Sequence, residues 1–188
     1  MIHLDADPTV IGKNYPAEVS IVGHAKPALQ MLLQLLRGQQ SPQERWPGPE
    51  LEEIRRDADA WLRGQAPLQC EVISQLQRVL SDDAIVVSGI TNIGYWSNFA
   101  LRVRRPRSYL TASYFATLGF AFPTALGAKV AAPDRPVISL SGDGGFMYAL
   151  PELATAVQYG INVVAMVFAD GAFGASKNDQ RTRFHGNI

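Results

Sequence analysis

The stretch Val137-Ile138-Ser139-Leu140-Ser141-Gly142-Asp143-Gly144-Gly145 carries the strongest pattern in this chain of 188 residues. Its first part is a short apolar run, which predicts a β-strand, and its second part is a glycine-rich turn that holds one carboxylate. A second apolar run, Val163–Phe168, ends in Ala169-Asp170-Gly171. Continuous apolar strands are typical of sheets that are covered on both faces. We therefore expect two buried strands, each followed by a polar loop.

The remaining segments alternate between strand and helix patterns, and this alternation predicts the fold class. We expect strands at residues 2–5, 19–23, 84–89, 109–111, 137–140 and 163–168, and helices at 27–36, 50–62, 68–80, 92–101, 115–130 and from Pro151 to Gly160. Alternating strands and helices imply right-handed crossovers and a parallel sheet flanked by helices, so the class is α/β. In such sheets ligands bind at the carboxyl ends of the strands, where the loops 142–145 and 169–174 are expected.

A turn-rich segment divides the chain into two parts. Residues 38–49 are rich in Pro, Gly, Ser and Gln, which is typical of a linker, and we place a domain boundary there. Residues 1–37 supply two strands and one helix, too few elements to close a sheet. Residues 50–188 hold the remaining elements and form the main predicted domain, which we expect to be truncated at its C-terminal end.

Composition and charge narrow the class of protein. The hydrophobic fraction is 47%, and 17 basic residues balance 17 acidic ones, which argues against a nucleic-acid or anionic-membrane partner. The cluster Arg102–Arg107 is either a solvated connection or a functional basic patch. The single cysteine, Cys70, excludes an internal disulfide and fits a reducing compartment. No segment has the ~20 apolar residues that cross a bilayer, and Met1–Asp7 does not resemble a signal peptide, so we expect a cytoplasmic protein.

The glycine-rich turn has the composition of an anion site that also contains an acid. Glycines let the backbone turn tightly and bring N–H groups close to phosphate oxygens. The carboxylate of Asp143 would repel a bare phosphate, but it is well placed if Mg²⁺ lies between the two, because Mg²⁺ binds carboxylate and phosphate oxygens together. The alternative is a turn whose Asp143 is solvated or caps a helix.

Several motifs together resemble one enzyme family. The segments 141–146, 152–156 and 170–174 resemble the pyrophosphate-binding domain of thiamine-diphosphate-dependent enzymes, most closely the acetolactate synthase-like branch. Residues 113–128 resemble the family segment Ser-x-x-Gly-Thr-Met-Gly-x-x-x-Pro-Ala-Ala-x-Gly-Ala. Residues 2–36 resemble the end of the family's Rossmann-like central domain. The resemblance covers nearly the whole chain and implies thiamine diphosphate and Mg²⁺ as cofactors.

The resemblance also implies roles for individual residues. Asp143 would bind the metal through its carboxylate, and Gly171 would bind it through its main-chain oxygen. Leu118 would be the apolar wedge under the bent cofactor, with a core leucine as the alternative, and the backbone near Ala116 would contact the aminopyrimidine. The residues that the resemblance places against the cofactor are Asn92, Ala116, Leu118, Gly142, Gly144, Gly145, Ala172 and Phe173.

Two departures from the family pattern bear on activity. Ala169 stands where the family has a metal-binding Asn, and alanine has no side-chain oxygen, so water or Asp170 would have to fill the position. The second departure is that the family's catalytic glutamate lies on a pyrimidine-binding domain that has no counterpart in this sequence. Glu152 is a poor substitute, because it belongs to the helix after the glycine-rich turn. We therefore assign no catalytic residue to this chain.

Two hypotheses about function remain open. The first is the cofactor-binding portion of an enzyme that cleaves or joins 2-oxoacids, completed by a pyrimidine-binding domain in a second copy, in a separate chain or in a longer gene product. The second is a non-catalytic relic that keeps the fold and binds the cofactor weakly. A nicotinamide-dinucleotide domain is disfavoured, because Met147 stands where Gly-x-Gly-x-x-Gly requires its third glycine.

Overall fold

The computed structural model describes residues 1–37, 48–112 and 115–186. The chain divides into two compact units, Met1–Leu51 and Glu52–Ile188. Most of the predicted linker, residues 38–47, lies outside the described residues, as do residues 113–114 of the segment that resembles the family.

The first unit holds two parallel strands and a helix, as predicted. Strand β1 (Ile2–Asp5) pairs with β2 (Val19–Val22), and the helix α1 (Ala25–Leu36) follows. A short 3-10 helix, η1 (Pro8–Val10), connects the strands. None of residues 1–37 is buried, which agrees with the expectation that these elements are too few to close a sheet.

The second unit contains a parallel sheet of four strands, which confirms the α/β class. Its strand order is β4-β3-β5-β6, and the bounds are β3 (Ile85–Ser88), β4 (Tyr109–Thr111), β5 (Val137–Gly142) and β6 (Val164–Phe168). Gly142 of β5 lies opposite Phe168 of β6 in the register. The two polar loops therefore leave the sheet side by side at its carboxyl edge.

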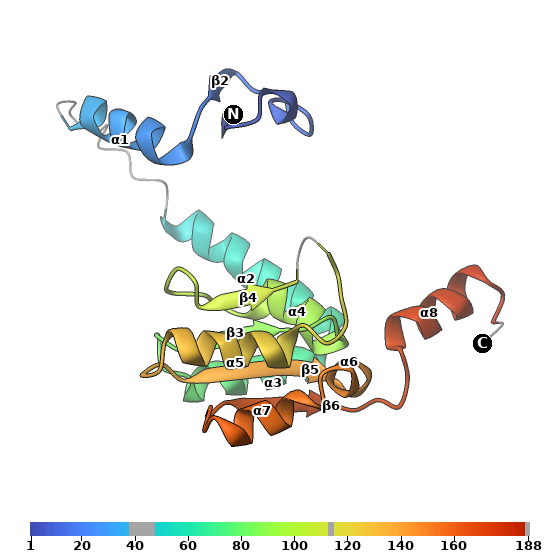
Figure 1. The fold of residues 1–188 in the computed structure, drawn as a ribbon. Coiled ribbons are helices and arrows are strands. Elements are labelled where there is room, and N and C mark those ends of the chain that lie inside the picture. Colours follow the sequence, from blue (N-terminus) through green and yellow to red (C-terminus); the bar gives the residue numbers. More distant parts are fainter. Residues whose placement is uncertain (38–47, 113–114, 187–188) are drawn as a thin grey trace. The chain divides into compact units, whose positions relative to one another are not determined.

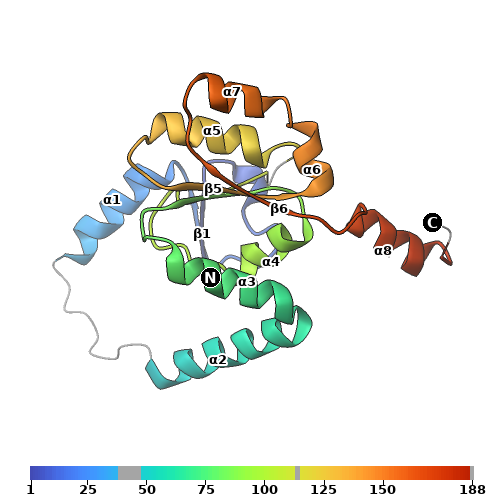
Figure 2. The ribbon, with the colours of Figure 1, turned by 90° about the horizontal axis from the view of Figure 1, so that it is seen from below.

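Helices cover both faces of this sheet. The helices from residue 48 onward are α2 (Gly48–Gln65), α3 (Pro67–Val79), α4 (Asn92–Ala100), α5 (Ala121–Ala131), α6 (Asp143–Tyr148), α7 (Glu152–Gln158) and α8 (Gly174–Arg183), of which α8 extends away from the sheet (Figure 1). Helices α3 and α4 lie on one face, and α5 and α7 lie on the other (Figures 1 and 2). In the described ranges, no helix combines the length and apolar character that spanning a membrane requires.

The alternation of side chains along the central strands divides the core between the two faces. Val86 and Ile138 belong to a cluster with Ile73 of α3, whereas Val87 belongs to a second cluster with Ala125 of α5. Successive residues of a strand point to opposite faces, so the continuous apolar runs of β3 and β5 are buried on both sides. The prediction of a doubly covered strand is confirmed for β5, and β3 is buried in the same way.

Strand β6 differs from that prediction. It is one of the two edge strands of the sheet, with β5 as its neighbour, and Val164 and Val167 keep 56% and 42% of their surface exposed. An apolar run shows that a strand can be buried on both faces, but it carries no information about whether a further element covers it.

The helix predicted at residues 115–130 begins later than expected, at Ala121. Gly119 has φ +81, a left-handed conformation that helices do not continue through. Pro123 also limits the start, because proline has no N–H to donate and fits only the first helical turn. Helix α6 likewise begins at Asp143, inside the segment expected as a loop, and α8 was not predicted.

Candidate functional site

A cavity of about 450 Å³ lies at the carboxyl ends of β3, β5 and β6. Segments far apart in the sequence meet there: the start of α4, the turn before α5, the start of α6 and the loop from β6 into α8. Most of the residues predicted to touch a cofactor line it. These are Asn92, Leu118, Gly142, Gly144, Gly145, Ala172 and Phe173, together with Asp143.

Asp143 connects the two polar loops. It is the first residue of α6, and its half-buried carboxylate accepts a hydrogen bond from the N–H of Gly171, with 3.3 Å between Oδ2 and N. Gly171 has φ +66, in the left-handed region that favours glycine. Its N–H group faces Asp143, so the structure brings together the two residues predicted to bind a metal.

Close contacts explain why two positions of the motif are glycine. A Cβ atom at Gly142 would lie 2.9 Å from Oγ1 of Thr91, and one at Gly144 would lie 2.7 Å from Cε1 of Phe173. Real Cβ atoms essentially never show such distances, so a side chain at either position would require Thr91 or Phe173 to move. The absence of side chains keeps the backbone at the start of α6 open toward the cavity, where N–H groups of a first helical turn have no partner within the helix.

Leu118 lines the cavity beside the first turn of α6. A Cβ atom at Gly145 would lie 3.7 Å from Cδ2 of Leu118, which is ordinary contact. Leu118 is half-buried and belongs to none of the core clusters in the described residues. This placement suits a wall of the cavity better than a core leucine. Ala116, by contrast, is exposed and does not line the cavity.

Asp170 lines the same cavity as Asp143, whereas Ala169 does not. Ala169 lines a neighbouring cavity of about 300 Å³, which Asp170 also reaches. Oδ1 of Asp170 accepts a hydrogen bond of 3.2 Å from the N–H of Ala172, which orients the carboxylate. Of the two residues that follow β6, Asp170 therefore faces the main cavity and Ala169 does not.

The donor set at this cavity suits a hard cation shared with a ligand. Among the described residues, no group of three or more His, Cys, Asp and Glu side chains could hold a metal by itself. Two carboxylates, Asp143 and Asp170, line the cavity. Mg²⁺ typically uses one or two carboxylates and takes its other oxygens from water and phosphate, so these residues fit a magnesium diphosphate.

Polar side chains from α4 complete the cavity on the β3 side. Asn92 accepts a hydrogen bond of 2.7 Å at its Oδ1 from Nε2 of Gln69, which leaves its NH₂ group as a donor. Thr91 and Tyr95 also line the cavity. No spacing in the sequence of their segment singles out these two residues.

Ser176 and Asn178 line the cavity from α8 and were missed in the sequence. Helix α8 consists of small and polar residues, so it lacks the apolar periodicity that predicts a helix. No signal in the sequence could have identified these two side chains.

The region that contains the cavity matches a known protein family. The model of the thiamine pyrophosphate enzyme C-terminal TPP binding domain matches residues 89–188, a range that contains every residue lining the cavity. The chain belongs to the thiamine pyrophosphate enzyme family. The resemblance to acetolactate synthase-like members that the motifs suggested is thereby confirmed at the level of the family.

Individual relatives align over most of the chain. A probable 2-ketoarginine decarboxylase of Pseudomonas aeruginosa is 34% identical over 95% of this chain and 32% of its own length. A probable acetolactate synthase large subunit of Methanocaldococcus jannaschii is 34% identical over 93% of this chain and 31% of its own length. An acetolactate synthase of Mycobacterium bovis is 35% identical over 93% and 29%. The chain thus spans about a third of the length of these relatives.

Proposed function

We propose that this chain is the diphosphate- and magnesium-binding portion of a thiamine-diphosphate-dependent enzyme that acts on 2-oxoacids. The observation that carries the proposal is the cavity where the open backbone of Gly144 and Gly145 meets the carboxylates of Asp143 and Asp170. The family match to this same region supports the identity of the ligand.

In this proposal Asp143 and Asp170 hold Mg²⁺, and the N–H groups of Gly144 and Gly145 receive the diphosphate. The cation between carboxylates and phosphates offsets a repulsion that would otherwise oppose binding. Asp170 replaces the oxygen that Ala169 lacks. The main-chain oxygen of Gly171 remains our proposed further ligand.

Apolar walls would position the rest of the cofactor. Leu118 lies against the first turn of α6, and Phe173 lies over Gly144, so both can exclude water from the ring system. We propose that the backbone near Ala116 contacts the aminopyrimidine. When bound, thiamine diphosphate supplies the nucleophilic carbon and the electron sink for breaking or forming a bond beside a carbonyl group.

The proton relay would come from outside this chain segment. Glu152 lies on α7 and does not line the cavity, so among the described residues it offers no base to the cofactor. We propose that a pyrimidine-binding domain, in a second copy or in a further polypeptide segment, supplies the glutamate. The reaction would then be carbon–carbon cleavage or ketol transfer.

A degenerate relic is the second candidate, and Ala169 is the observation that favours it. Loss of a metal-binding oxygen without replacement should weaken Mg²⁺ binding at least about 10-fold. Mutation of a residue that only supports a metal ligand already lowers metal affinity about 10–100-fold. The two candidates therefore differ in affinity for the magnesium cofactor.

Calorimetric titration with thiamine diphosphate and Mg²⁺ separates them, using the natural chain beside Ala169→Asn. We expect both proteins to bind, with affinities within a few-fold of each other, because Asp170 supplies the oxygen. Binding by Ala169→Asn alone would establish the relic. Absence of binding by both proteins would contradict the proposed function of this chain.

A further inference from the structure

A second polar groove lies between α2, α3 and the segment that follows α4. Its volume is about 310 Å³. Four arginines line it: Arg63 from α2, Arg78 from α3, and Arg102 and Arg104 from the connection to β4. Arg102 and Arg104 belong to the basic run whose role the sequence left open.

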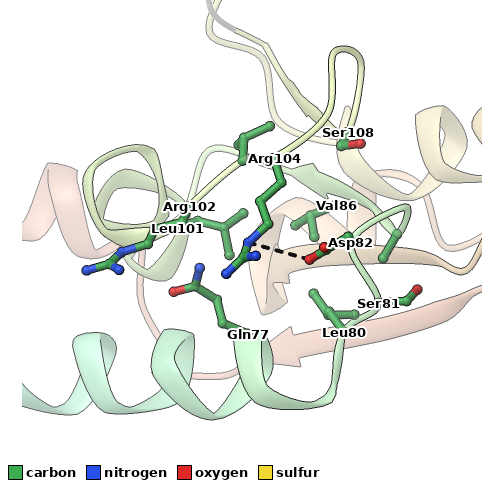
Figure 3. Close-up of a pocket in the computed structure, with 11 residues that line it drawn as sticks. Gln77, Leu80, Ser81, Asp82, Val86, Leu101, Arg102, Arg104 and Ser108 are labelled. Atoms are coloured by element: carbon green, nitrogen blue, oxygen red, sulfur yellow. Dashed lines mark ion pairs between the residues drawn. The ribbon is translucent and has the colours of Figure 1, made fainter.

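A smaller cavity of about 110 Å³ adjoins the groove at the amino edge of the sheet, beside Ser108, which directly precedes β4. Figure 3 shows Arg104 reaching between Gln77 and Asp82 in this cavity, with Arg102 extending away from it. Gln77, Arg102 and Arg104 line both spaces. None of the residues of either space lines the cavity that contains Asp143, which opens at the carboxyl edge.

The arginines are only partly neutralised. Nη2 of Arg102 lies 3.1 Å from Oδ2 of Asp59, and Nε of Arg104 lies 3.4 Å from Oδ1 of Asp82. In both pairs each side chain keeps more than half of its surface exposed, and exposed pairs of this kind contribute about 0–1 kcal/mol. An incoming anion can therefore replace either aspartate at little cost.

Arg63 and Arg78 form no ion pair with any described residue. The two spaces thus hold four guanidinium groups against two carboxylates, in a chain whose total charge is zero. Guanidinium groups bind phosphate through paired N–H donors and stay charged at any physiological pH. The excess of two positive charges matches a phosphate dianion.

Part of the groove's floor is apolar. The half-buried Leu62 and Ala100 line this part, and Ile73 and Cys70, which also border it, are buried. A volume near 300 Å³ is at the lower end of the range for small-molecule sites, which combine apolar walls with a few charged groups. An inorganic ion would leave this floor without a partner.

We propose that the groove binds a phosphate monoester with an apolar body, whose phosphate contacts Arg63, Arg78 and Arg102 and whose body lies against Leu62 and Ala100. The site is open to a small molecule while the diphosphate cavity is filled, because the two share no lining residue. It therefore gives the chain a second anion site, with a ligand that differs from the cofactor.

Titration of the 188-residue chain with phenyl phosphate tests the proposal, with backbone amide NMR shifts as the readout and EDTA present to keep metal from Asp143. We expect saturable shifts at Ile73 and Ser74. The double variant Arg63→Gln/Arg78→Gln should weaken binding about tenfold or more, since it removes two charge-assisted contacts. Arg181→Gln, an arginine of α8 outside the groove, should bind like the natural chain.

Weaker binding by the double arginine variant could also result from loss of folding, so a second variant that should bind more tightly serves as a control. Asp59→Asn frees the guanidinium of Arg102, so we expect phenyl phosphate to bind severalfold more tightly. Inorganic phosphate at equal ionic strength should bind more weakly than the ester, and equal binding would contradict the role of the apolar floor. Shifts confined to residues 142–145, no saturable shifts, or equal loss in Arg181→Gln would overturn the proposal.

Discussion

Asp143 and Asp170 line one cavity, and this pairing bears on how the metal would be held. The carboxylate of Asp143 accepts the N–H of Gly171, and the carboxylate of Asp170 accepts the N–H of Ala172. Each acid is thus oriented by a neighbouring main-chain donor. Two charged oxygen ligands attract Mg²⁺ more strongly than one carboxylate and one amide, so Ala169 need not prevent metal binding.

For the single residue Asp170, we predict that Asp170→Ala lowers the affinity for Mg²⁺ by about 10–100-fold, because it removes a ligand that no neighbouring side chain replaces. Asp170→Asn keeps one side-chain oxygen and should lose less. Calorimetric titration with Mg²⁺ at saturating thiamine diphosphate measures both variants. Equal affinities of Asp170→Ala and the natural chain would show that Asp170 is not a ligand.

Two glycines inside helices, where glycine is intrinsically unfavourable, differ in whether packing requires them. A Cβ atom at Gly94 of α4 would collide with the main-chain oxygen of Gly89 and lie 2.7 Å from Oγ of Ser88. The same atom at Gly127 of α5 would have nothing within 4 Å. Helix α4 therefore requires glycine where it crosses the end of β3, and α5 does not.

We predict opposite effects on the free energy of unfolding for these two positions. Gly94→Ala should destabilise the protein by about 1–3 kcal/mol, the usual cost of overpacking. Gly127→Ala should stabilise it by about 0.4–1 kcal/mol, because alanine restricts the unfolded chain. Urea denaturation followed by circular dichroism measures both. Stabilisation by both substitutions would contradict the close contact of α4 with β3.

Across the whole molecule, the amino edge of the sheet is tied together by polar contacts. Arg135 donates from Nε to the main-chain oxygen of Asp83 at 2.6 Å and from Nη2 to Oγ of Ser108 at 2.7 Å. Ser81 donates to Oδ1 of Asp83 at 2.6 Å. This hydrogen bond from Ser81 is the main cause that lowers the pKa of Asp83 below its ordinary value of 3.8.

The lowered pKa of Asp83 predicts a pH dependence of stability. A carboxyl group whose pKa is lower in the folded state stabilises the protein above its unfolded pKa, and this contribution is lost as the pH falls through the folded pKa. Stability should therefore decrease between about pH 5 and pH 2, and Ser81→Ala should decrease less over that interval. Urea denaturation at several pH values measures the difference, and identical pH profiles for both proteins would contradict it.

The sequence predicted the central part of this fold and less of its periphery. The apolar run Val137–Leu140 and the glycines after it were sufficient to locate a buried strand and a site at its carboxyl end, because burial and close backbone approach both constrain residue type. The exposure of β6 could not be predicted, since its residues are equally apolar whether or not another element covers them.

Similar reasoning applies to the site residues that sequence analysis left open or missed. Asp170 and Ala169 are adjacent, and consecutive side chains leaving a strand point in different directions, so a shift of one position decides which of them faces the cavity. Ser176 and Asn178 lie on a polar helix without apolar periodicity. Their contribution depends on where α8 begins, which the residue types do not determine.

The central claim is that the cavity at the carboxyl edge binds thiamine diphosphate through a metal held by Asp143. Calorimetric titration of the natural chain and of Asp143→Ala with thiamine diphosphate, each with Mg²⁺ and with EDTA, tests it most directly. We predict that the natural chain binds only with Mg²⁺ and that Asp143→Ala does not bind. Equal binding by both proteins, or binding that does not depend on Mg²⁺, would contradict the account.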